Sequence, residues 1–233
     1  MPNFSKRATE PEIMDDFGLA SAEIDPLLGG LEMVNKYLGG YQVVFSALKE
    51  VSVQNSFHIS DWGCGSGDVL RAVAQKWKNL NLSFTGIDAT PAAVNFANRK
   101  NSEPNISFIL ADVLSKEISE LKFDIVLSTL FTHHFADDAW ISLVRKMMAC
   151  SRHAVIIDDL HRHWLPYYTI KLITKLLTNS RLAQNDGPLS VLKGFKRKEL
   201  KFLLQKAGIK NYTIKWMWAF RWQIILYKTK FDL

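Results

Sequence analysis

Short apolar runs alternate with amphipathic runs through the middle of the chain. The apolar runs predict strands at residues 57–61, 82–88, 106–113, 123–129 and 153–160. Apolar side chains recur at helical spacing over residues 69–79, 91–100 and 137–150. Strands that alternate with helices predict a parallel sheet covered on both faces. The strands are apolar almost throughout, which is typical of strands buried on both sides.

The pattern differs at both ends of this region. Residues 1–54 predict helices that end at the glycine pairs Gly29-Gly30 and Gly39-Gly40, because glycine reaches left-handed angles cheaply. Residues 160–195 are too long for a plain connection and predict a helical insertion, in which Asn185–Pro188 predicts a turn. A further helix at 196–209 and a closing antiparallel pair of strands complete residues 55–233.

Composition narrows the class of protein. The chain has 233 residues, of which 48% are apolar and 22% charged, as in a globular protein. Two cysteines fit a reducing compartment and exclude a disulfide scaffold, so we expect a cytoplasmic protein. The first residues lack the apolar core of a secretory signal, and no apolar run is long enough to span a membrane.

The net charge of +6 is concentrated in one segment. Residues 161–215 hold twelve Lys and Arg but only two acids, Asp186 and Glu199. We interpret this segment first as a solvated helical surface. A nucleic-acid face, an acidic membrane or an anionic substrate are the alternatives.

The strongest chemical signal is a glycine-rich loop that follows the first predicted strand. It runs from Asp61 to Asp68 and contains Gly63, Gly65 and Gly67. A dinucleotide fold would need the spacing G-x-G-x-x-G, and acids at both ends of this loop would oppose a pyrophosphate. They suit a ligand with a positive centre, such as the ammonium and sulfonium of S-adenosylmethionine.

Two more acids end successive strands. Asp88 ends the second predicted strand, where a carboxylate can accept both hydroxyls of a ribose, and Asp112 ends the third, beside a position for adenine. With the loop, these acids make the chain resemble the class I S-adenosylmethionine-dependent methyltransferases over residues 55–160. A nicotinamide-type or cofactor-free Rossmann domain is the alternative. The cofactor contacts expected from the resemblance are Asp61, Gly63, Cys64, Gly65, Asp88, Ala89, Asp112, Val113 and Ser128.

The resemblance also implies an architecture. We expect an α/β fold with a Rossmann-like, seven-stranded, mostly parallel sheet, its last pair of strands reversed. Residues 1–54 and the insertion at 160–195 would form a helical lid over a small-molecule acceptor. The charged residues 7–16 either close over the cofactor or form a solvated tail, the second being favoured. A separate nucleic-acid-binding module is not visible, so nucleic acid is a less favoured partner, and peripheral membrane contact through the basic lid stays open.

Candidates for chemistry follow the fourth and fifth strands. His134 and His133 can take a proton from an acceptor hydroxyl near neutral pH. Asp158 and Asp159, with Tyr167 and Tyr168 of the insertion, are candidates to bind the acceptor, and no metal is predicted because magnesium prefers oxygen ligands. The favoured function is O-methylation of a small aromatic or apolar molecule. Carbon or nitrogen methylation, RNA methylation and a non-catalytic cofactor-binding protein are the alternatives.

Overall fold

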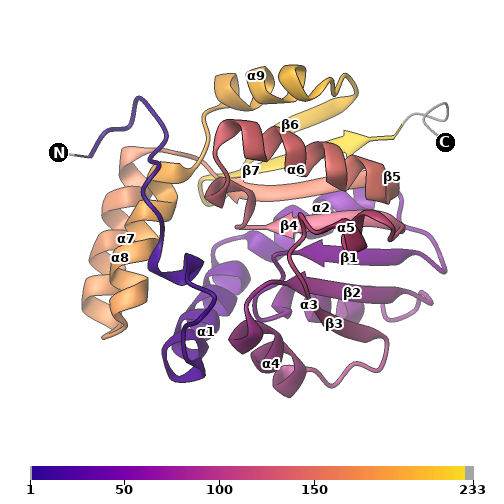
Figure 1. Ribbon diagram of the computed structural model, residues 1–233, viewed down its shortest axis with the longest axis horizontal. Coiled ribbons are helices and arrows are strands. Elements are labelled where there is room, and N and C mark those ends of the chain that lie inside the picture. The colour runs from indigo at the N-terminus through magenta and orange to yellow at the C-terminus, as the bar shows by residue number, and fades with distance from the viewer. Residues whose placement is uncertain (1, 229–233) are drawn as a thin grey trace.

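In the part of the chain that the structure describes, seven strands form one sheet in the order β3-β2-β1-β4-β5-β7-β6 (Figure 1). A computed structural model describes residues 2–228, apart from the side chain of Leu177. The strands are β1 (His58–Trp62), β2 (Ser83–Asp88), β3 (Ile106–Leu110), β4 (Phe123–Thr129), β5 (Ser151–Leu160), β6 (Tyr212–Met217) and β7 (Arg221–Tyr227). The predicted mostly parallel sheet is confirmed. β7 is antiparallel to both β5 and β6, so β7 alone is reversed rather than the last pair.

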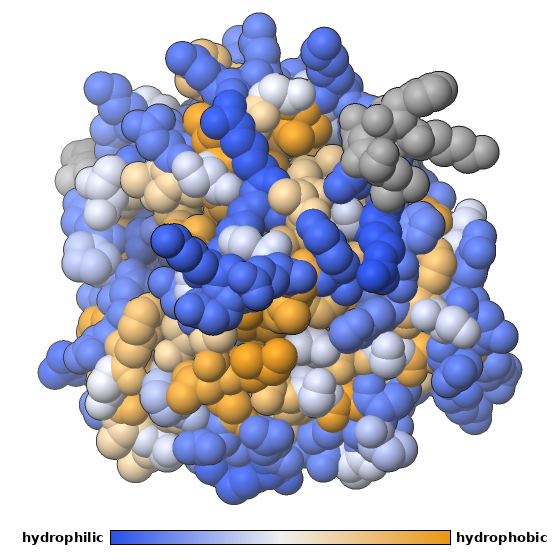
Figure 2. All heavy atoms as spheres, turned by 45° about the vertical axis from the view of Figure 1, so that its right-hand side comes forward, coloured by the Kyte–Doolittle hydropathy of each residue, from blue (hydrophilic) through white to orange (hydrophobic). Residues whose placement is uncertain are grey.

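Helices cover both faces of this sheet. The helices α2 (Gly40–Glu50) and α3 (Asp68–Lys76) lie on one face, and α5 (Lys116–Ser119), α6 (Asp137–Cys150) and α9 (Arg197–Ala207) lie on the other. Side chains alternate accordingly along β4: Ile125 and Leu127 pack toward α2 and α3, and Val126 packs toward α6. Within residues 2–228, none of the helices is long and apolar enough to cross a bilayer. Figure 2 shows one face of the molecule, largely hydrophilic with apolar groups between.

The N-terminal helix α1 (Ser21–Tyr37) joins the edge of the fold through a separate cluster. Ile24 and Leu28 pack against α4 (Pro91–Lys100) and Leu182. Gly29 and Gly30 lie inside α1, so the helix end predicted there is wrong. Two interior glycines cost about 1 kcal/mol each, which burial of the neighbouring leucine offsets. Gly39 does mark the next boundary, because its φ of +86° turns the chain into α2.

The insertion forms two helices, α7 (Trp164–Leu177) and α8 (Arg181–Lys193), which pack on each other. Asn185–Pro188 lies inside α8, so the predicted turn is wrong. Asp186 is buried because its carboxylate accepts the backbone amides of Ile13 (2.9 Å) and Met14 (3.0 Å). The polar character that made Asn185–Pro188 resemble a turn therefore includes Asp186, which α8 uses to bind the backbone of Ile13 and Met14.

Residues 2–20, which we call the strap, run from α8 toward α1 and contain the short helix η1 (Ile13–Asp15) (Figure 1). Arg7 anchors the strap: it donates to the carbonyls of Lys193 (2.9 Å) and His133 (3.0 Å) and pairs with Asp137 (2.7 Å). The favoured expectation of a solvated tail is wrong, because this guanidinium ties the strap to three elements of the fold, those that contain Lys193, His133 and Asp137.

Candidate active site

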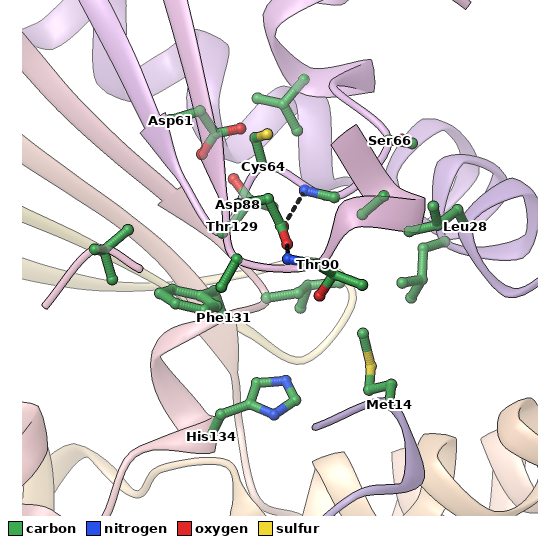
Figure 3. Close-up of a pocket in the computed structure, with 18 of the residues that line it drawn as sticks. Met14, Leu28, Asp61, Cys64, Ser66, Asp88, Thr90, Thr129, Phe131 and His134 are labelled. Carbon is green, nitrogen blue, oxygen red and sulfur yellow. Dashed lines mark hydrogen bonds between the residues drawn. The ribbon is translucent and has the colours of Figure 1, made fainter. Parts of the chain in front are cut away.

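One cleft opens at the carboxyl ends of the parallel strands, where β1 and β4 lie side by side. Ligands of open α/β sheets bind at such a point, where the strand order reverses. The cleft has a volume of about 340 Å³, and its walls come from the strap, α1 and the segments after β1, β2, β3 and β4. Figure 3 shows side chains from these segments arranged around one space.

The loop after β1 brings bare backbone to the cleft wall. Gly63, Gly65 and Gly67 have φ values of +70°, +50° and +72°, which side chains rarely adopt. A Cβ on Gly63 would also lie 2.3 Å from the ring of Phe131, and one on Gly67 would lie 2.5 Å from Phe108. The loop therefore requires these glycines for its conformation and for its packing.

Asp88 holds this loop against the end of β2. Its two carboxylate oxygens accept the amides of Gly65 and Thr90, each at 2.9 Å (Figure 3). Burial raises the pKa of Asp88, and these two hydrogen bonds oppose that rise. Each carboxylate oxygen keeps a lone pair for a further donor, as two ribose hydroxyls would require.

Two more carboxylates lie close to Asp88. Asp61 is buried, and its Oδ1 has no hydrogen-bond partner among the described residues. Burial raises the pKa of Asp61 well above its ordinary value, with further contributions from Asp68 and Asp88. Asp68 accepts hydrogen bonds from Ser66 and Asn35, but within residues 2–228 none of the three acids pairs with Lys or Arg. The cleft therefore suits a ligand that carries positive charge.

Three of the expected cofactor contacts, Asp112, Ala89 and Val113, line the same cleft. Asp112 is held by the amide of Leu114 at 2.8 Å. The predicted contact Ser128 is placed elsewhere.

Ser128 is buried within β4, and its hydroxyl donates to the carbonyl of Trp62 at 3.0 Å. The residues that follow it, Thr129 and Leu130, line the cleft instead. The predicted contact at Ser128 therefore lies one residue before the end of β4, and the residues that reach the cleft begin at Thr129.

His134 faces the cleft and is held from behind by the strap. Its Nδ1 lies 2.6 Å from Asp15 Oδ1, and Figure 3 shows its ring between Phe131 and Met14. Burial alone would lower the pKa of His134, but the hydrogen bond to Asp15 and the carboxylates of Glu12 and Asp15 outweigh it, so the pKa is raised. The same contact lowers the pKa of Asp15 to about 2 against the effect of burial.

His133 points away from the cleft. Its Nδ1 lies 2.7 Å from Asp159 Oδ1, while its amide and the hydroxyl of Thr132 donate to Asp159 Oδ2. Asp159 thus fixes the turn η2 (Thr132–His134) that carries both histidines. Burial would raise the pKa of Asp159, but the contacts with His133 and Thr132 lower it.

Asp158 is also engaged inside the protein. It pairs with Arg221 at 2.6 Å, and Arg221 also donates to Asn35 at 3.0 Å. Asp158 and Asp159 are both fully buried, so neither reaches an acceptor in the cleft. The structure corrects their predicted role: they hold β5 to β7 and to η2.

Tyr167 and Tyr168 lie on α7, outside the cleft wall. Tyr168 is 50% exposed, and Tyr167 packs edge-on against Phe4 of the strap. The aromatic side chains that do line the cleft come from the strap and from the segment after β4: Phe17, Phe131 and Phe135.

A cluster of titratable groups lies behind His134. Glu12, His133 and His134 offer ligand atoms within 4.8 Å of one another, a spacing that a metal ion could bridge. Lys193 Nζ already lies 3.4 Å from both Glu12 and Asp15, so a cation of the protein compensates these carboxylates. We therefore assign no metal ligands here, and the cluster serves to hold the strap.

The comparisons with known proteins agree with this geometry. Residues 59–153 match the family described as a methyltransferase domain. The chain therefore contains a class I S-adenosylmethionine-dependent methyltransferase domain. Over 88 residues it is 26% identical to malonyl-[acyl-carrier protein] O-methyltransferase of Acetivibrio thermocellus, covering 38% of this chain and 30% of that protein. Over 66 residues it is 35% identical to trans-aconitate 2-methyltransferase of Escherichia coli O1:K1, covering 28% and 25%. The match thus spans less than a third of each relative.

Solved methyltransferases share most of this fold. The plantazolicin methyltransferase in complex with SAH is 16% identical, with a TM-score of 0.64, over 88% of this chain and 90% of that one. Human N-acetylserotonin methyltransferase in complex with SAM is 16% identical, with a TM-score of 0.66, over 95% of this chain and 64% of that one. The fold therefore extends beyond the segment that the family match covers.

Proposed function

We propose that this protein transfers a methyl group from S-adenosylmethionine to a small apolar or aromatic acceptor, at an oxygen atom. One observation carries the proposal: a single cleft brings the acids Asp61 and Asp88 together with His134, which Asp15 holds. The acids suit the charged donor, and the imidazole supplies a proton acceptor beside it.

The donor's contacts follow from the carboxylates. Bound S-adenosylmethionine would supply an electrophilic methyl group and its own leaving group. Asp61, whose Oδ1 lacks a partner among residues 2–228, would accept from the ammonium. Asp88 would accept from the ribose hydroxyls, and Asp112 with Val113 would border the adenine. These residues mainly bind and orient, which is most of what an in-line displacement needs.

The remaining wall favours an apolar acceptor. Met14, Phe17, Leu114 and Phe135 add side chains without charge to the wall of the same cleft. Aromatic and aliphatic walls with few polar groups are typical of sites for flat organic molecules. The strap and α1, within residues 1–54, and α8 of the insertion would act as the lid over this acceptor.

His134 would remove the proton of an acceptor hydroxyl. Asp15 holds its Nδ1, and this fixes the ring and leaves Nε2 as the atom that accepts a proton. The raised pKa makes this imidazole a stronger base when it is neutral. Its buried neighbour His133 would position η2 rather than exchange protons with the acceptor.

Labelled S-adenosylmethionine and the purified protein test this function. A panel of phenols, carboxylic acids, aromatic amines, carbon nucleophiles and RNA should yield label only in small hydroxyl-bearing molecules, located by mass spectrometry. His134→Ala should lower kcat by about 100-fold or more while donor affinity stays the same. His153→Ala, which changes an exposed histidine at the far end of β5, is the control. Label in RNA or in amines alone, or an unchanged kcat for His134→Ala, would contradict the proposal.

A further inference from the structure

Helix α7 is more apolar than the other long helices of this protein, yet none of its described side chains is buried. Figure 1 shows α7 with α8 at the edge of the molecule, away from the sheet. A helix this apolar is ordinarily covered by protein or by lipid. Its exposed surface therefore calls for a partner.

The exposed residues form one stripe. Leu165, Leu172 and Leu176 stand at i, i+7 and i+11, which places them on one helical face. Leu172 is 58% exposed and Leu176 is 70% exposed. The opposite side packs on α8, because a Cβ on Gly187 would lie 2.8 Å from Ile170 Cγ2. The leucine stripe thus points away from the fold, and we call it the α7 face.

Basic and aromatic residues border the α7 face. Lys171 and Lys175 are exposed, and within residues 2–228 neither forms an ion pair. Trp164 and Tyr168 lie one turn apart on the same border and are both half exposed or more. Lysines beside an apolar stripe, with aromatic rings that are apolar at one end and polar at the other, are typical of helices that lie in a membrane interface.

We infer that the α7 face binds the surface of an anionic lipid bilayer, with its leucines in the boundary between headgroups and acyl chains. Charge complementarity selects this partner: α7 carries no acidic residue, and Lys171 and Lys175 border its leucines without an ion pair among residues 2–228. A second copy of the chain would instead bring two lysine-bordered faces together, and like charges repel. The inference does not depend on the proposed methyl transfer, although α8 connects the α7 face to the strap beside the cleft.

Vesicle sedimentation with the full chain tests this inference. Binding to vesicles of mixed phosphatidylcholine and phosphatidylglycerol should exceed binding to phosphatidylcholine alone by about tenfold and should weaken with salt. The double substitution Leu172→Glu with Leu176→Glu should reduce binding at least about tenfold. The matched control is Phe202→Glu on α9, which places the same charge on an apolar residue that is 54% exposed elsewhere.

A lysine double variant and circular dichroism test whether charge and an intact fold account for the binding. Lys171→Glu with Lys175→Glu should remove the preference for phosphatidylglycerol, and circular dichroism should show that every variant keeps its helices. Equal binding to both kinds of vesicle, or equal loss in the Phe202→Glu control, would overturn the inference. So would a lipid-free dimer in sedimentation equilibrium that Leu172→Glu with Leu176→Glu converts to a monomer, because the α7 face would then bind a second copy.

Discussion

The contact between Asp15 and His134 can be measured before the acceptor is known. Asp15→Asn keeps the size of the side chain and a hydrogen-bonding group but removes the charge beside the imidazole. Four charged or titratable groups act on His134 besides Asp15: Glu12 from the strap, Lys193 from α8, His133 from the same turn and Asp88 across the cleft. The hydrogen bond and charge of Asp15 help to raise the pKa of His134, so that pKa should fall in Asp15→Asn.

The pKa of Asp15 bounds the size of this coupling, because the backbone of Glu12 and the charge of Lys193 also help His134 to lower it. Its fall from 3.8 to about 2 corresponds to about 2.4 kcal/mol if it acts in full. The side chain of Asp15 is 34% exposed, so solvent screening reduces the value to about 1–2 kcal/mol. Asp15→Asn should lower the free energy of unfolding by that amount where both partners are charged.

The two pKa shifts fix the pH window. The lowered pKa of Asp15 contributes stability above pH 3.8, which is lost as the pH falls through about 2. The raised pKa of His134 contributes stability in full below its ordinary 6.5, which is lost as the pH rises through the folded value. The stability difference between wild type and Asp15→Asn should therefore be largest between about pH 4 and 6.5 and shrink above the folded pKa of His134.

Nuclear magnetic resonance titration of the His134 ring, assigned with His134→Ala, reads the pKa directly. Denaturant unfolding at about pH 5 and about pH 9 reads the stability difference. Asp16→Asn is the control, because it removes a neighbouring exposed charge whose carboxylate accepts the amide of Gly18 and does not contact His134. If His134 titrates at the same pH in wild type and Asp15→Asn, or if Asp16→Asn has the same effect, Asp15 does not hold the imidazole.

Three further predictions concern the donor loop and the buried pair. Asp88→Ala should weaken binding of S-adenosylhomocysteine at least about tenfold in calorimetry, since charge-assisted hydrogen bonds are worth roughly 1.5–3 kcal/mol each, and unchanged affinity would exclude the ribose role. Gly63→Ala should lower both the melting temperature and the affinity for S-adenosylhomocysteine, because the new Cβ clashes with Phe131. Gly30→Ala in α1 should instead raise the melting temperature, because its Cβ meets open space and alanine favours a helix. Arg221→Met should lower the free energy of unfolding by about 3–5 kcal/mol, because it leaves Asp158 buried and unpaired. Adding Asp158→Leu should restore most of that loss. If it does not, the broken ion pair is not the cause of the loss.

The sheet and the donor side of the cleft could be predicted because their signals are local. Each strand is a short apolar run, and the acids Asp61, Asp88 and Asp112 stand at or just beyond the ends of such runs. Parallel strands bring their carboxyl ends to one edge, so adjacency in space follows from position along each strand. The same reasoning fails for Asp158 and Asp159, because the reversed strand β7 brings Arg221 against this end of β5, and η2 folds over it.

The strap shows why the acceptor side could not be predicted. The sequence favoured a solvated segment because a charge without a partner needs water. The oppositely charged partners come from distant segments: Asp137 pairs with Arg7, and Lys193 pairs with Glu12. Asp15 and His134 are separated by 119 positions, and no periodicity links them. The one usable signal was the density of acids and bases within residues 7–16. A segment so charged gains little by packing on an apolar surface, so its close fit requires partners of opposite charge on the elements that it covers, as Asp137 and Lys193 are.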